Sequence, residues 1–215
     1  MVRMDFVSPV QSLIPGVQGR VLDVLAQTTA ELNLGTLARL AGVSQAQASR
    51  VLPRLVALGV VERRDVPPSS PFRLVRENLM AQAIVDLTDV RDRAIERLRV
   101  LADGIRPVPA NLVVFGSFAR GEADVESDVD VLVVRRIDVD EDDERWGDAL
   151  SNWLVDARRV VGNSVNHIEI AEPALPRLCR GRLGREIVRD AIVLLGRWDP
   201  EGSSTRHSKG ADKRR

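Results

Sequence analysis

The feature that most constrains the fold is the stretch of residues 111–135, which reads NLVVFGSFARGEADVESDVDVLVVR. It begins with an apolar run at residues 112–115, whose length and β-branched content predict a buried strand. Gly116 and Ser117 end this run, and residues 118–120 predict a short helix. A helix that starts directly after a strand offers backbone N–H groups to a phosphate. The stretch therefore predicts a phosphate-binding turn, with the Ser117 hydroxyl as a further donor.

Two acids, Asp128 and Asp130, precede a second apolar run at residues 131–134. Because strand side chains alternate, both acids project from one face, about 6.6 Å apart along the strand. Mg²⁺ is usually bound through one or two carboxylates together with phosphate oxygens. Either half of this pattern is common on solvated turns when it occurs alone. In the order strand, Gly-Ser, short helix, paired acids and strand, it predicts a site for Mg²⁺ or Mn²⁺ with ATP or another nucleoside triphosphate.

Residues 116–134, GSFARGEADVESDVDVLVV, resemble the signature of the polymerase-beta-type nucleotidyltransferases in their compact form, the minimal nucleotidyltransferases. The approximate family pattern is GSxARGxxxxxSDxDLxV. The matching residues are Gly116, Ser117, Ala119, Arg120, Gly121, Ser127, Asp128 and Asp130, while Val131 replaces Leu. The resemblance implies that Gly116, Ser117, Arg120 and Ser127 form the nucleotide-binding site. It also implies that Asp128 and Asp130 ligate two Mg²⁺ ions.

The resemblance further implies a third carboxylate on a later strand. Residues 164–171, SVNHIEIA, predict that strand, with His167 and Glu169 on one face. Glu169 is the expected third carboxylate, which would complete the metal site and help to deprotonate the attacking hydroxyl. Glu172 is the alternative. The preceding helix is expected to end near residue 161 and to bury Trp146, Leu150, Trp153, Leu154 and Ala157.

Residues 36–61, TLARLAGVSQAQASRVLPRLVALGVV, resemble a winged helix-turn-helix of the bacterial regulator type. Helices are predicted at residues 17–28, 37–41 and 45–58, with Thr36 as the N-cap of the second, and strands at residues 60–64 and 72–75. The candidate DNA-contacting residues, on and beside the third helix, are Ser44, Gln45, Gln47, Ser49, Arg50 and Arg54. Arg63, Arg64 and Arg73 would serve a wing. The alternative is a protein-docking module with a solvated polar face.

The expected fold class is α/β (α+β), with a winged helix-turn-helix domain at residues 1–76 and a polymerase-beta-like nucleotidyltransferase domain with a small mixed sheet at residues 107–199. A linker helix is expected at residues 77–106. Its single long pattern over residues 77–104 would carry a homodimer seam or would pack against its own domain. Residues 200–215 are expected to be a disordered tail.

Composition limits the class of protein. The sequence has no run of eighteen apolar residues, so a membrane span is not expected. The N-terminus lacks the long apolar segment of a secretion signal, so the expected location is the cytoplasm. One cysteine, Cys179, cannot form an intrachain disulfide, and a structural zinc site is not expected. Residues 1–75 hold eight Arg against five acids, whereas residues 111–200 hold twelve Arg against eighteen acids. A basic front and an acidic back fit a nucleic-acid reader joined to a metal-binding enzyme.

The leading hypothesis is Mg²⁺-dependent transfer of a nucleoside monophosphate, AMP first among them, to a protein or RNA hydroxyl. By resemblance, relatives of this size are often antitoxins that modify a HEPN-type toxin, and some act on tRNA ends. A second hypothesis is a winged-helix transcription regulator that senses a nucleotide without turnover. A third is nucleotidylation of an antibiotic, which generally requires a larger helical substrate domain than residues 172–199 supply.

Overall fold

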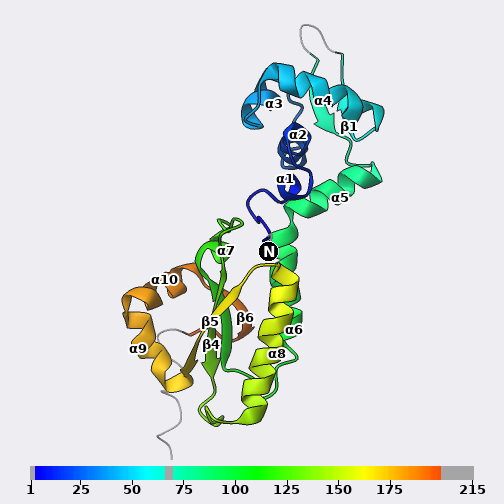
Figure 1. Cartoon of the computed structure of the whole chain (residues 1–215). Helices are drawn as coiled ribbons and strands as arrows, with labels where there is room; N and C mark the ends of the chain where they lie inside the picture. The colour runs from blue at the N-terminus through cyan, green and yellow to red at the C-terminus, as the bar shows by residue number, and fades with distance from the viewer. Residues whose placement is uncertain (1–2, 66–69, 200–215) are drawn as a thin grey trace, which may run out of the picture. The chain divides into compact units, whose positions relative to one another are not determined.

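The computed structural model describes residues 3–65 and 70–199. Its internal contacts divide the chain into two units, Met1–Arg93 and Ala94–Arg215 (Figure 1). The chain combines helices with a small mixed sheet, as the predicted fold class requires. The expected disordered tail at residues 200–215 lies outside the described residues. Within the described part of the chain, no helix is both long enough and apolar enough to cross a membrane.

In its described residues, the first unit contains five complete helices and a two-stranded antiparallel hairpin. Its elements are α1 (Pro9–Leu13), α2 (Val17–Ala26), α3 (Leu34–Leu40), α4 (Gln45–Ala57), β1 (Val61–Arg63), β2 (Phe72–Leu74) and α5 (Leu79–Thr88). Leu22, Leu25 and Leu37 from α2 and α3 are buried with Leu52 and Leu55 from α4. The apolar stripe of α4 therefore faces the core and leaves its polar stripe exposed, as the spacing predicts.

Side-chain caps set the starts of α3 and α4. Asn33 caps α3, because its side chain accepts a hydrogen bond from the Thr36 backbone N–H at 2.8 Å. The expectation that Thr36 is the cap is wrong: the helix already begins at Leu34, and the residue before it, Asn33, is a strong N-cap type. Ser44 and Gln47 form a capping box at the start of α4.

The segment expected to be one long helix is divided at Asp89. α5 ends at Thr88, and α6 (Val90–Ala102) starts two residues later and continues into the second unit. The Asp89 N–H donates to the Leu87 carbonyl instead of the carbonyl four residues back, which breaks the helical pattern. Aspartate competes with the backbone for hydrogen bonds and favours helix ends over helix interiors. Pairing of two chains through this segment stays a prediction.

The second unit is built around a four-stranded mixed sheet with the order β5-β4-β3-β6. The strands are β3 (Asn111–Phe115), β4 (Val129–Arg135), β5 (Val165–Ala171) and β6 (Ile192–Gly196). β3 is antiparallel to both of its neighbours, β4 and β6, whereas β4 and β5 are parallel. The remaining elements are α7 (Gly116–Arg120), α8 (Glu144–Val161), the 3-10 helix η1 (Glu172–Ala174), α9 (Leu175–Arg180) and α10 (Arg182–Asp190).

Helices cover both faces of this sheet. α9 and α10 lie on one side and α8 on the other (Figure 1). On the first side, Leu175 and Ile187 pack against a cluster that includes Val113, Leu132 and Val134. On the other side, α8 buries the five residues predicted for its core face, which are Trp146, Leu150, Trp153, Leu154 and Ala157. The parallel β4–β5 pair requires a crossover, and α8 supplies it.

Candidate active site and DNA-binding surface

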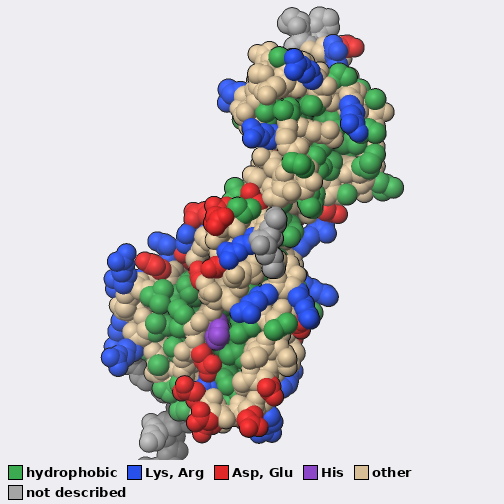
Figure 2. Space-filling view, viewed as in Figure 1, with side chains coloured by type: hydrophobic (Ala, Val, Ile, Leu, Met, Phe, Trp, Pro, Cys, Tyr) green, Lys and Arg blue, Asp and Glu red, His purple; other side chains and the backbone are tan. Residues whose placement is uncertain are grey.

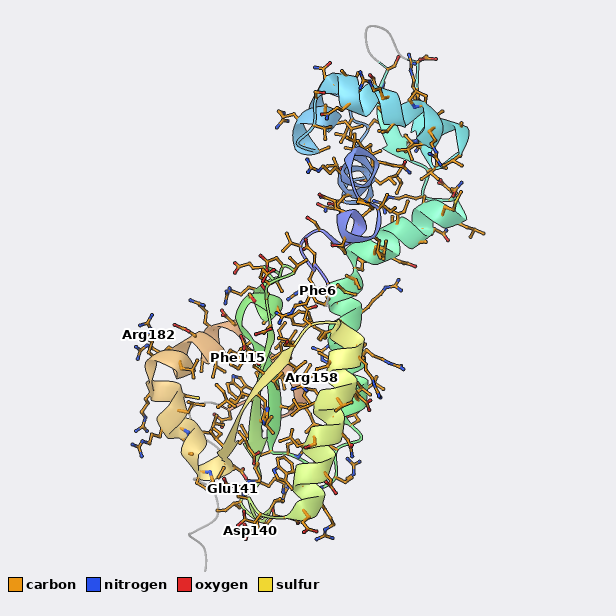
Figure 3. All side chains as sticks on the ribbon, in the orientation of Figure 1. Phe6, Phe115, Asp140, Glu141, Arg158 and Arg182 are labelled. Atoms are coloured by element: carbon orange, nitrogen blue, oxygen red, sulfur yellow. The ribbon has the colours of Figure 1, made fainter. Side chains whose placement is uncertain are left out.

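A tight turn joins β3 to α7. Phe115, labelled in Figure 3, is the last residue of β3, and Gly116 begins α7 with a φ of +76°. A Cβ atom on Gly116 would lie 2.9 Å from Oδ2 of Asp130. Glycine is therefore required both for its left-handed backbone and for the close approach to this carboxylate. Ser117 follows, half-buried, and no side chain caps the helix.

Asp128 and Asp130 lie where β4 begins, and both are half-buried. Asp130 pairs with Phe115 across the β3–β4 ladder, so it lies beside the Gly116 turn. Burial, and after it the negative charge of Asp128, raises the pKa of Asp130. Two carboxylates that repel each other on a partly buried face form a donor set that a divalent cation would stabilise. The structure thus brings together the predicted phosphate-binding turn and the predicted acid pair.

Asn166 is a residue of this site that sequence reasoning missed. It is the partner of Asp130 in the parallel β4–β5 ladder, and its Nδ2 donates a hydrogen bond to Oδ2 of Asp128 at 3.0 Å. Side-chain alternation along β5 places it on the face of Ile168, opposite Glu169. Only the register between the two strands identifies Asn166, because nothing within the 164–171 segment marks it.

The structure does not bring Glu169 to the acid pair. Glu169 is the ladder partner of Val133, further along the sheet than Asp130 and on its opposite face. Its Oε1 accepts hydrogen bonds from Nε of Arg135 and from Nε1 of Trp146, each at 2.9 Å. The expectation that Glu169 completes the site is therefore corrected: this carboxylate holds α8 against the sheet.

The alternative, Glu172, is no nearer to the acid pair. It lies in η1, which follows the far end of β5, whereas Asn166 lies near the start of that strand. Within residues 3–65 and 70–199, no group of three or more His, Cys, Asp and Glu side chains is placed to hold a metal ion. The protein donors at this place are thus two carboxylates and one amide.

Arg120 connects α7 to α10. Its Nε donates to Glu122 at 2.7 Å, and its Nη1 donates to Asp190 at 2.6 Å. Asp190 also accepts from Arg189, and these hydrogen bonds, with Arg189 the larger cause, lower the pKa of Asp190 to about 2. The Arg120 guanidinium therefore helps to hold the turn in position through its two carboxylate partners. A contact between Arg120 and a nucleotide stays a prediction.

Hydrogen bonds stabilise the loop between α7 and β4. The Ser127 hydroxyl donates to Oδ1 of Asp124 at 2.9 Å, which is the main cause that lowers the pKa of Asp124. Nδ2 of Asn163, a buried residue, donates to the Ser127 carbonyl oxygen at 2.9 Å. Ser127 therefore organises the loop that presents Asp128. Acidic side chains gather over this part of the molecule (Figure 2).

In the first unit, the six candidate DNA-contacting residues fall into two groups. Ser44 and Gln47 satisfy each other's backbone N–H groups in the capping box, and the Ser49 hydroxyl donates to the Ala46 carbonyl oxygen. All six residues are exposed, but the other group, Gln45, Arg50 and Arg54, takes no part in these local hydrogen bonds. Neither arginine forms an ion pair in the part of the chain that the structure describes. These three side chains are therefore the better placed to contact DNA.

The arginines of the β1–β2 hairpin are paired with acids. Arg63 pairs with Asp65 at 3.2 Å, Arg64 with Glu31 at 2.6 Å, and Arg73 with Glu62 at 2.7 Å. All of these groups are at least partly exposed, so water and salt screen each pair. The hairpin consequently offers less free positive charge than its three arginines suggest, and the predicted tip, residues 65–71, lies largely outside the described residues.

A part of each unit matches a known protein family. Residues 94–169 match the family described as nucleotidyltransferase domain, and residues 14–69 match the MarR family. No curated protein sequence matches the chain.

The solved structures that are similar to part of the chain include two whose descriptions bear on the site. One is a crystal structure of a toxin-antitoxin with AMP-PNP, at 19% identity over 47% of this chain and 73% of that one, with a TM-score of 0.34. The other is a candidate nucleotidyltransferase from Sulfolobus solfataricus, at 21% identity over 48% of this chain and 85% of that one, with a TM-score of 0.25.

Proposed function

Because the chain joins a MarR-family winged-helix domain to a nucleotidyltransferase domain, we propose that its second unit transfers a nucleoside monophosphate from a triphosphate to a hydroxyl. The observation that carries this proposal is the contact between the Gly116 turn and Asp130, where a Cβ would lie 2.9 Å from the carboxylate oxygen. A phosphate bound at the turn is thereby beside the acid pair. ATP is the first triphosphate to test.

The acid pair fits Mg²⁺ or Mn²⁺. Asp128 and Asp130 lie on one face, and their mutual repulsion contributes to the raised pKa of Asp130. These carboxylates would hold the cation together with phosphate oxygens. When bound, the cation would neutralise charge on the phosphates and on the leaving pyrophosphate.

The chain's own residues supply position and charge. The Gly116 turn and the Ser117 hydroxyl would bind phosphate oxygens, and Arg120, tied to Asp190 at 2.6 Å, keeps this turn against α10. The attacking hydroxyl oxygen forms a bond to the α-phosphorus, the bond to pyrophosphate breaks, and the hydroxyl proton is released. Positioning of this kind, together with electrostatic stabilisation, accounts for most of the catalysis of phosphoryl transfer.

The acceptor of the nucleotide would be a protein or RNA hydroxyl, with a HEPN-type toxin or a tRNA as the candidates. Arg177, Arg180, Arg182 and Arg185 are exposed on α9 and α10, which cover the sheet face that carries Asp130. Figure 3 shows Arg182 pointing away from the sheet. Such a surface favours an anionic acceptor.

The first unit would bind DNA through α4. We propose that the protein is an antitoxin-type enzyme that also represses its own promoter, with Gln45, Arg50 and Arg54 as the contacts. A regulator that senses nucleotide without turnover is the second candidate. The amide of Asn166, where a third carboxylate was expected beside Asp130, is the observation that favours it.

Labelling separates the two candidates. Incubation with α-labelled ATP, Mg²⁺ and cell extract should label a protein or an RNA, and Asp130→Asn should abolish the labelling. Asp148→Asn, which changes an exposed carboxylate on α8 on the other side of the sheet, is the control and should label as the wild type does. A wild type that binds ATP with Mg²⁺ but labels nothing would make the sensor the better proposal.

A further inference from the structure

Asn166 places an amide beside both carboxylates of the candidate site. It is the direct ladder partner of Asp130, and it donates to Asp128 at 3.0 Å. One residue therefore faces both carboxylates. Its hydrogen bond uses an oxygen lone pair of Asp128 that would otherwise be available to a cation.

A cation that binds with the triphosphate and a cation that binds only beside it differ in what they need from the protein. The first receives phosphate oxygens, so one or two carboxylates suffice. A second cation, placed at the attacking hydroxyl, has fewer phosphate ligands and depends more on protein carboxylates. Among the described residues, the site brings together two carboxylates, Asp128 and Asp130, whereas Glu169 is bound to Arg135 and Trp146 on the other face.

We infer that Asn166 makes this a site for a single divalent cation, which enters with the triphosphate, and that the amide keeps nucleotide transfer slow. This inference rests on the proposed function, whose nucleotide site it describes. Asn166 is a positioning residue in the wild type, because its N–H orients Asp128. An aspartate at the same position would provide the third carboxylate that a second cation requires.

The test counts bound Mn²⁺ on the full chain. Wild type and Asn166→Asp are saturated with α,β-methylene-ATP, whose α–β bridge is not cleaved, and free Mn²⁺ is measured by electron paramagnetic resonance. We expect one Mn²⁺ per bound analogue in the wild type and one more in Asn166→Asp. With cleavable ATP, transfer by Asn166→Asp should be at least about tenfold faster, because a second cation would lower the pKa of the attacking hydroxyl.

The matched control is His167→Asp. His167 is the next residue of β5, equally exposed, and its side chain projects from the opposite face. This variant adds the same charge to the same strand, so its Mn²⁺ count and transfer rate should equal those of the wild type. Without metal, Asn166→Asp should melt below the wild type because three carboxylates repel one another, and Mn²⁺ should reverse the difference.

The wild-type count is decisive by itself. Two Mn²⁺ per bound analogue in the wild type, or equal counts in wild type and Asn166→Asp, would overturn the inference and leave the proposed function standing. A wild type that binds neither the analogue nor Mn²⁺ would overturn both. A count that rises by one in His167→Asp as well would show a non-specific effect of charge, and it would also refute the role of Asn166.

Discussion

Glu169→Gln tests whether this carboxylate serves the fold or the chemistry. The Glu169 side chain is 27% exposed, and its Oε1 accepts from Arg135, whose side chain is only 10% exposed, and from the indole N–H of Trp146. Glutamine retains an oxygen acceptor but loses the charge, so the Arg135 guanidinium loses its principal counter-charge. Glu141, the other carboxylate near Arg135, lies at 3.4 Å and is 83% exposed, so it compensates little.

The expected loss of stability follows from these contacts. A hydrogen bond to a charged group contributes about 1.5–3 kcal/mol, and removal of one partner of a buried ion pair costs about 3–5 kcal/mol. Because Glu169 is partly exposed and glutamine still accepts a bond, we expect a loss of about 2 kcal/mol. For a unit of this size, that change corresponds to a fall in Tm of about 8 °C.

Tryptophan fluorescence during urea unfolding is the assay. The chain has three tryptophans, Trp146, Trp153 and Trp198, and all of them lie in the second unit, so the signal reports its unfolding. Glu172→Gln is the control. Because Glu172 is exposed, this variant should unfold at the same urea concentration as the wild type. Triphosphate binding should survive in both variants.

The opposite pattern would refute this reasoning. If Glu169→Gln unfolded as the wild type does, bound triphosphate normally and transferred nucleotide 10²–10⁴-fold more slowly, Glu169 would be a catalytic base. The observed position of Glu169 on the far face would then not describe the active enzyme.

Three further predictions follow from single contacts. Gly116→Ala should remove triphosphate binding in calorimetry, since the new Cβ would lie 2.9 Å from the Asp130 carboxylate and the φ of +76° would add about 1 kcal/mol of strain. Arg50→Ala should weaken DNA binding in gel shifts and reduce the salt slope by about 1, whereas Arg64→Ala should have less effect because Glu31 already pairs with Arg64; equal effects would contradict the distinction. The pKa of Asp190 is lowered from 3.8 to about 2 on folding, so its contribution to stability is present above pH 4 and is lost as the pH falls toward 2. Urea unfolding should therefore show a smaller loss of stability between pH 4 and pH 2 in Asp190→Asn than in the wild type.

Local patterns predicted most of the elements near the site. The run before Gly116 forms β3, the run that follows Asp130 forms most of β4, and the apolar stripe of α8 is buried as its spacing requires. These features depend on side-chain alternation and helical periodicity, which act between residues close in sequence. The turn at Gly116 was predictable for the same reason, because a left-handed backbone strongly favours glycine.

The break at Asp89 shows the limit of periodicity. Apolar spacing continues from α5 into α6, so the pattern alone predicts one helix. Whether Asp89 is helical depends on a small difference in free energy. Helical backbone hydrogen bonds favour one conformation, and the other hydrogen bonds that Asp89 can form favour the break. The spacing of apolar residues does not contain that difference.

The sequence alone therefore determined the β3–α7–β4 segment, the acid pair at the start of β4 and the winged-helix order of the first unit. The tertiary structure alone decided which residue of β5 lies beside Asp130, and it selected Asn166 instead of Glu169. Alternation assigns a side chain to a face of its own strand, but it does not give the register of β5 on β4, which exists only when the two strands pair across the α8 crossover. A carboxylate predicted for the metal site is thus an anchor of the core, and an amide lies in the site.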